Sequence, residues 1–401
     1  MGVDRHGLMR PAALLTTAAL ALACSGPVAT PSVSPASSAS PAATAVSSPS
    51  PAATPADQST LDEALAYLGP IPQTIAFTDW TAIRAGAGAE ALTGASSIEE
   101  KFLAIRNAAT AGGFGMSTFR THVADWGFDV FDLAWEARAD GPEAHFWILR
   151  MRDGFDTSVI AAKLDEYGFR SEQLARGILR TATGPSAGGP GPGNVFLVEF
   201  TNTGFLDDGR TLVVSAGSAD AVREILTSGP LPVADLSVRS AAGLLGGPTA
   251  AALRAADECS RILAQTPGAQ RAGLEAELEA AGPLGHYNAL AVGYRLGRDP
   301  IGRIVFGYAE AGQAAADLAG REQLAREGHS LRNDIRYADR YFSVAGAHVE
   351  DRAVVLDVGP VSPRQASPLP TPAQMSAAEL FARNLIVMWI QRDMLFGACS
   401  P

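Results

Sequence analysis

Residues 132–151 read DLAWEARADGPEAHFWILRM, and this stretch gives the clearest indication of the fold. Apolar and polar residues alternate on both sides of Asp140-Gly141-Pro142, which is a turn sequence. Alternation with a period of two is typical of a strand with one buried face, and two such runs around a short turn predict a β-hairpin. The stretch therefore predicts antiparallel sheet.

The order hairpin, helix, hairpin, helix is predicted twice along the chain. The first series occupies 132–151, 156–168, 195–215 and 218–229. The second occupies 288–310, 312–327, 341–358 and the stretch from 376, where Ser376 and Glu379 have capping-box spacing. Antiparallel sheet with helices on one face is the simplest way to bury such elements. We therefore predict an α+β fold of two similar halves, 58–240 and 241–401, each with its helices packed on one sheet face. The stretch 250–264 fits helix or strand.

The first 23 residues have the features of a secretory signal peptide. A basic start is followed by an apolar run from Pro11 to Ala23, which is shorter than the roughly 20 residues that span a bilayer. Small residues precede Cys24, so cleavage is expected between Ala23 and Cys24. The chain is therefore predicted to be exported.

Residue Cys24 has two interpretations. The tetrapeptide ALAC at 21–24 resembles a bacterial lipobox, in which the cysteine receives a diacylglycerol. Ordinary cleavage would instead release a soluble secreted protein. Residues 24–57 are mostly Ser, Pro, Ala and Thr, too poor in apolar bulk to fold, and a disordered tether of this kind suits an anchored domain. We therefore expect Cys24 to hold the protein to the outer face of the cell membrane.

Composition limits the partners and the redox state. The net charge of −11 argues against nucleic acid as a partner, because nucleic-acid binding usually needs a basic face. With Cys24 lipidated, Cys259 and Cys399 remain, and two cysteines in an exported chain predict one disulfide. Two free buried thiols are the alternative.

Catalytic and metal-binding motifs are absent from the sequence. It contains no H-E-x-x-H, no G-x-S-x-G, no phosphate-binding loop with Gly-Lys-Ser/Thr and no C-x-x-C. The five remaining histidines outside the signal peptide are spread singly. We therefore predict no catalytic residue, no cofactor and no resident metal.

One stretch, DWGFDVFDLAWE at 125–136, combines carboxylates with aromatic residues. On a helix its carboxylates would share a face and could bind a cation or act as acid and base. On a strand Asp129 and Asp132 would point to opposite faces, and we expect a structural turn leading into a strand. The candidate site consists of Asp125, Trp126, Asp129, Asp132 and Trp135.

Three stretches carry a family resemblance: FTDW at 77–80, residues 125–136, and RDMLFGAC at 392–399. With them the chain resembles a set of uncharacterised secreted lipoproteins of high-GC bacteria, chiefly actinobacterial. The resemblance implies a location outside the cell and carries no activity or catalytic residue.

The functional hypothesis that follows is a membrane-anchored, non-catalytic module that binds a protein partner or a small apolar ligand. A cell-wall-associated hydrolase that uses a carboxylate pair is the first alternative. A structural or assembly protein of the cell envelope is the second.

Overall fold

The computed structural model describes residues 59–69, 73–105, 126–141, 145–183, 200–215, 217–255, 259–262, 268–297, 299–361 and 376–400. These residues belong to one compact unit, Pro55–Pro401. The predicted signal peptide, the tether to residue 57, the cleavage site at Ala23 and Cys24, and Asp125 of the candidate acidic site lie outside the described residues.

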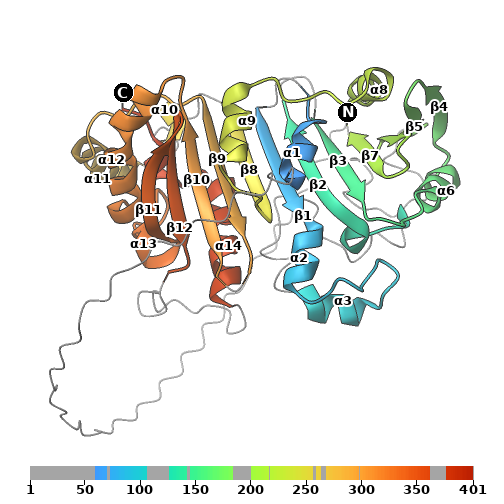
Figure 1. Cartoon of the computed structure of the whole chain (residues 1–401), viewed down its shortest axis with the longest axis horizontal. Helices are drawn as coiled ribbons and strands as arrows, with labels where there is room; N and C mark the ends of the chain where they lie inside the picture. Colours follow the sequence, from blue (N-terminus) through green and yellow to red (C-terminus); the bar gives the residue numbers. More distant parts are fainter. Residues whose placement is uncertain are drawn as a thin grey trace, which may run out of the picture. The chain divides into compact units, whose positions relative to one another are not determined.

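Twelve strands form one antiparallel sheet, in which β2 and β3 are the hairpin predicted at 132–151 (Figure 1). The α+β class is thus confirmed. In sheet order the strands are β11 (Ser343–Glu350), β12 (Ala353–Gly359), β10 (Ile301–Gly307), β9 (Ala289–Arg295), β8 (Ala250–Ala255), β1 (Thr74–Asp79), β2 (Leu133–Asp140), β3 (His145–Met151), β7 (Thr211–Ser215), β6 (Asn202–Leu206), β5 (Gly177–Thr181) and β4 (Arg170–Leu174).

The strand order runs in the same way outward from the central pair of β1 and β8. One side reads β1-β2-β3-β7-β6 and continues into β5 and β4, and the other reads β8-β9-β10-β12-β11. The two sides share one continuous sheet, because β1 pairs with β8 along its length. The boundary placed at 240/241 falls inside helix α9 (Leu236–Gly243), which packs on β8, β9 and β10. The halves are therefore not separate domains.

Helices cover both faces of the sheet, so the expectation that they pack on one face was wrong. On β10, Ile304 and Phe306 join one core and Val305 joins the core on the opposite face. Strands that are apolar on both faces need cover on both. One face is covered by α1 (Thr60–Leu65), α8 (Ala219–Ser228) and α9, and the other by α2 (Trp80–Gly86), α6 (Ser158–Glu166), α11 (Gly268–Ala280), α12 (Ala311–Glu327) and α14 (Ala377–Ile390).

The shorter elements lie between these layers or at their ends. They are α3 (Ile98–Ile105), η1 (Val130–Asp132), α10 (Cys259–Ile262), α13 (Tyr337–Arg340) and η3 (Leu395–Gly397). The capping box predicted for α14 is present, since the Ser376 hydroxyl accepts from Glu379 N at 3.2 Å and the Glu379 carboxylate accepts from Ser376 N at 2.7 Å. The ambiguous stretch from 250 begins as strand β8 and continues as α10.

Candidate functional site

The two described carboxylates of the predicted acidic site hold a turn together. Asp129 accepts from Phe131 N at 2.8 Å and caps the 3-10 turn η1. Asp132 accepts from Asp129 N at 3.1 Å and from Gly94 N at 2.9 Å. Both side chains are buried and bonded to backbone. This is the geometry of a structural turn leading into a strand, and it leaves neither carboxylate directed at a substrate.

The two tryptophans of that site belong to different cores. Trp126 stacks on Phe200, with 4.5 Å between ring centroids, beneath α2 and α6. Trp135 lies in the core on the opposite face of the sheet, where its indole N–H donates to Glu63 at 3.0 Å. The described members of the acidic and aromatic stretch therefore do not converge on one site.

A buried ion pair adjoins the turn, and the sequence did not reveal it. The Lys101 ammonium lies 2.6 Å from Asp129 Oδ2 and 2.7 Å from the carbonyl oxygen of Gly94. Burial raises the pKa of the Asp129 carboxyl, an effect that its hydrogen bond to Lys101 opposes. Arg84 is buried nearby and donates to Leu133 O at 2.6 Å, and burial lowers its pKa to about 10. Lys101 fastens the segment before and within α3 to the turn, and Arg84 fastens α2 to it.

The described histidines have separate partners on separate elements. His329 lies 2.8 Å from Glu277, His348 lies near Glu350 and Asp357 at the sheet edge, and His145 contacts Asp140. His286 lies beside the sulfur of Cys259. His122 is outside the described residues. Among the described residues, these four histidines thus contact different partners.

The middle of the sheet carries polar side chains on a face that is apolar to either side. The strand register aligns Arg254, Thr74, Asp140 and His145 in one row across β8, β1, β2 and β3. The next row on the same face of the sheet contains Arg138. The row after that contains Thr78 and Glu136, which lie opposite each other on β1 and β2. We call these seven residues the central polar strip. It lies between the core of α2 and α6 and the core of α11, α12 and α14.

Each side of the central polar strip has an arginine stacked on a tryptophan. The Arg138 guanidinium lies 5.2 Å from the ring centroid of Trp147. The Arg254 guanidinium lies 4.4 Å from that of Trp389 on α14. Arg138 also pairs with Asp140 at 3.0 Å, and the His145 ring meets Trp147 edge-on at 4.6 Å. Stacked cations of this kind present flat polarisable surfaces with hydrogen-bond donors at their rims.

Some of the buried polar atoms without a hydrogen-bond partner lie at or next to this part of the sheet, and others lie on β5, β6 and α11. The first group includes the Thr78 hydroxyl and the indole nitrogens of Trp147 and Trp80. Thr78 is 0% exposed, and Trp147 is 4% exposed. A buried donor left unpaired costs about 1–3 kcal/mol, so such groups call for a specific explanation. A ligand that supplies the missing partners is one explanation.

The sequence contained a signal for the central polar strip within its opening stretch. Glu136, Arg138 and Asp140 alternate with alanines on one strand, so they share one face of β2. Nothing local showed that β8 would bring Arg254 to the same face.

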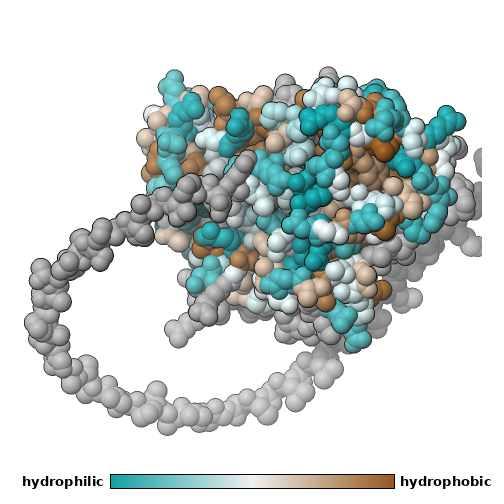
Figure 2. Space-filling view, turned by 45° about the vertical axis from the view of Figure 1, so that its right-hand side comes forward, coloured by the Kyte–Doolittle hydropathy of each residue, from teal (hydrophilic) through white to brown (hydrophobic). Residues whose placement is uncertain are grey.

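The face drawn in Figure 2 shows no extended apolar patch over its described residues. Hydrophilic and apolar residues are mixed on the face in Figure 2, with the brown patches separated by teal. The large apolar side chains that are exposed lie on different elements: Ile98, Val159, Leu236, Ile301 and Ile390. Of these, Ile390 follows Trp389 at the end of α14.

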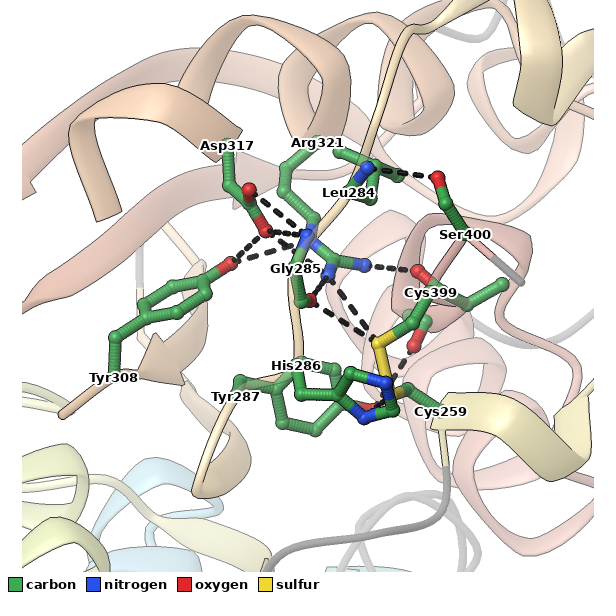
Figure 3. Close-up of a disulfide and its surroundings, with 12 residues drawn as sticks. Cys259, Leu284, Gly285, His286, Tyr287, Tyr308, Asp317, Arg321, Cys399 and Ser400 are labelled. Atoms are coloured by element: carbon green, nitrogen blue, oxygen red, sulfur yellow. Dashed lines mark hydrogen bonds and ion pairs between the residues drawn. A yellow bond between two sulfur atoms is a disulfide. The ribbon is translucent and has the colours of Figure 1, made fainter. Parts of the chain in front are cut away.

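Cys259 and Cys399 form the disulfide expected from the sequence (Figure 3). Cys259 begins α10 and Cys399 follows η3, so the bond ties the C-terminal segment to the middle of the chain. Since 140 residues separate the two cysteines, the loop-entropy model gives a stabilisation of about 5 kcal/mol as an upper bound.

Arg321 is itself fully buried and is the centre of a network beside the disulfide (Figure 3). Its guanidinium donates to the carbonyl oxygens of Phe396 and Gly285, both at 2.8 Å, and to that of Ala398. Asp317 is its ion-pair partner at 3.3 Å and also accepts from the Tyr308 hydroxyl at 2.8 Å. Burial raises the pKa of Tyr308. Arg321 donates mainly to backbone carbonyl oxygens, so the network has a structural role.

No protein-family model matches the chain, and no curated protein is similar to it. Among solved structures, crystal form I of TP0453 is similar at a TM-score of 0.34 and 10% identity, over 81% of this chain and 97% of that chain. Crystal form III of TP0453 is similar at a TM-score of 0.37 and 10% identity, over 80% of this chain and 97% of that one.

Proposed function

We propose that the protein is a lipid-anchored, non-catalytic binding module outside the cell, and that its central polar strip receives the ligand. The observation that carries the proposal is the set of unpaired buried atoms at Thr78 and Trp147 beside Arg138 and Arg254. In the acidic turn and the Arg321 network, in contrast, the charged side chains bond to backbone groups. The partly exposed members of the strip, Arg138, Asp140 and His145, offer hydrogen-bonding groups beside the aromatic ring of Trp147.

The chemistry of the strip favours a small amphipathic ligand over a purely apolar one. The ligand's apolar or planar part would lie along the stacked Arg138–Trp147 and Arg254–Trp389 pairs. Its polar groups would meet the Trp147 N–H and the carboxylate of Asp140, which is one-third exposed. A protein partner that presents such a group from a loop would satisfy the same contacts.

Native mass spectrometry of protein purified from its own host tests this assignment. We expect a bound small molecule on the wild-type chain and about tenfold lower occupancy on the double variant Arg138→Gln and Arg254→Gln. If each guanidinium contacts the ligand with about 0.5–1 kcal/mol, the loss of two such contacts lowers affinity by about tenfold.

The control removes two exposed arginines that lie away from the strip, as Arg223→Gln with Arg336→Gln. It makes the same change in charge and should keep the bound molecule. A bound mass that survives the strip substitutions, or a wild-type chain that carries none, would contradict the assignment. The second of these outcomes would favour the structural or assembly role.

The hydrolase alternative gains no support from the described carboxylates. Asp129 is paired with Lys101 and Asp132 accepts from two backbone N–H groups, so the pair has no free oxygen facing an open cleft among the described residues. General acid–base work needs a carboxylate within reach of a substrate proton.

Anchoring is tested separately, by Cys24→Ser. Among the described residues, no helix has both the length and the apolar character needed to cross a bilayer. We therefore expect the substitution to move the protein from the membrane fraction to the medium, because only the acyl chains would hold it there. Immunoblots of both fractions measure this, with Cys259→Ser as the control that should keep its membrane location. Unchanged membrane retention of Cys24→Ser would reject the lipid anchor.

A further inference from the structure

We propose that reduction of the Cys259–Cys399 disulfide creates a binding site for a zinc-like divalent cation, with His286 as the third ligand. The sulfurs of both cysteines and a ring nitrogen of His286 lie within 4.8 Å of one another. His286 Nδ1 is 3.4 Å from Cys259 Sγ. A tetrahedral zinc with bonds of about 2.3 Å to sulfur and about 2.0 Å to nitrogen spaces such atoms by about 3.5 Å. The nitrogen is therefore at ligand spacing from Cys259 Sγ, whereas the two sulfurs are bonded to each other until the disulfide is reduced.

The two thiols would stay together after reduction, because other contacts hold the C-terminal segment. Arg321 donates to the carbonyl oxygen of Phe396 within η3 and to that of Ala398 directly after it. Ser400 N donates to Leu284 O at 3.0 Å, and Leu284 N donates to the Ser400 hydroxyl at 2.8 Å. The Tyr287 hydroxyl donates to Gly397 O at 3.0 Å. A site whose ligands are already placed binds its metal without first ordering a flexible chain.

The charges around the site balance once the metal is bound. Arg321 Nη2 lies 3.9 Å from Cys399 Sγ. Two thiolates balance the two charges of the cation, and Asp317 balances Arg321. His286 is exposed whereas both cysteines are buried, so the metal would enter from the His286 side (Figure 3). Three protein ligands leave the fourth position of the tetrahedron to water.

The reaction balances with a dithiol as reductant. The dithiol gives two electrons and two protons to the disulfide, which becomes two thiols, and is itself oxidised to a disulfide. The thiols then release two protons as the cation binds, and two sulfur–metal bonds and one nitrogen–metal bond form. The bridge and the metal site exclude each other, so the redox state decides which one is present.

Cobalt(II) binding to the Cys24→Ser chain tests the proposal, since that chain keeps Cys259 and Cys399 as its only cysteines. The chain is reduced with a phosphine, which competes for metal less than a dithiol does, and is then freed of reductant. We expect one cobalt per chain, with thiolate-to-cobalt charge transfer in the near ultraviolet and the visible bands of tetrahedral cobalt. The oxidised chain should show neither.

Two histidine variants distinguish a three-ligand site that includes His286 from cobalt binding by the two thiols alone. His286→Ala should weaken cobalt binding about 100-fold, because loss of even a supporting partner costs about 10–100-fold. His329→Ala, a histidine paired with Glu277 elsewhere in the same half, should bind as the parent does. Circular dichroism follows folding in each sample. Equal affinity of His286→Ala and the parent, a folded reduced chain that takes no cobalt, or unfolding on reduction would each overturn the proposal.

Discussion

Replacement of Arg321 by methionine is expected to lower the free energy of unfolding by about 3–5 kcal/mol. Methionine fills much of the same space but leaves Asp317, which is 3% exposed, without its counter-charge. It also removes the donors from the carbonyl oxygens of Phe396, Ala398 and Gly285. The loss of one partner of a buried pair is costly because the remaining charge is neither hydrated nor paired.

Urea denaturation followed by circular dichroism measures this loss. Arg326→Met is the matched control, because Arg326 lies on the same helix and forms a half-exposed pair with Glu322. Exposed pairs contribute about 0–1 kcal/mol, so the control should lose far less stability. Arg321→Lys should fall between the two, because an ammonium keeps the charge but cannot match the planar fork of the guanidinium. Equal losses for Arg321→Met and Arg326→Met would show that the network does not hold the C-terminal segment.

The substitution Lys101→Met is expected to destabilise the protein by a similar amount, about 3–5 kcal/mol. The side chain of Lys101 is 4% exposed and that of Asp129 is 0% exposed, so the variant leaves a buried carboxylate without its cation. The sequence supplies the control, since Lys163 is the other lysine of the chain and lies in an exposed pair with Glu166. Lys163→Met should change stability by about 0.5 kcal/mol or less.

A double-mutant cycle isolates the pair from its surroundings. Asp129→Asn keeps the shape of the cap and removes the charge, so Lys101→Met combined with Asp129→Asn should cost less than the sum of the two single changes. Additive losses would mean that Lys101 and Asp129 do not interact.

The loss in free energy of unfolding caused by Lys101→Met, here called the deficit, should also depend on pH. Burial raises the pKa of Asp129 in the folded chain above the ordinary 3.8, and the loss of Lys101 removes an opposing effect. A group whose folded pKa is raised binds its proton more tightly when folded, so its protonation favours folding at low pH and this contribution is lost as the pH rises through the folded pKa. The deficit should therefore shrink as the pH falls toward the ordinary carboxyl range, and a constant deficit would contradict the assignment.

Local sequence patterns predicted those elements whose characteristic residues lie within a short stretch of sequence. Alternation around Asp140-Gly141-Pro142 predicted β2 and β3, and the Ser376–Glu379 spacing predicted the start of α14. The β4–β5 hairpin was missed because β4 is exposed for most of its length, so its sequence shows no apolar alternation. Where burial does not shape the side-chain pattern, periodicity carries little information.

The sites were harder to predict than the elements. Asp129 and Asp132 were recognised, but Lys101 reaches Asp129 from another segment and gave no local signal. Arg321 is one arginine of a chain rich in arginine, and its role follows from partners on η3, on β10's end and in the loop before β9. Likewise, Arg254 joins the central polar strip only through the pairing of β8 with β1.

The sequence by itself predicted the β2–β3 and β9–β10 hairpins, the capping box of α14 and one disulfide as the favoured state of Cys259 and Cys399, because periodicity, capping residues and the cysteine count need no knowledge of distant neighbours. The tertiary structure decided that β1 and β8 merge the two halves into one sheet, that both faces are covered, and which charges meet in its interior. These features depend on contacts between residues far apart in the chain, and their energies come from burial and desolvation that exist only once the sheet has formed.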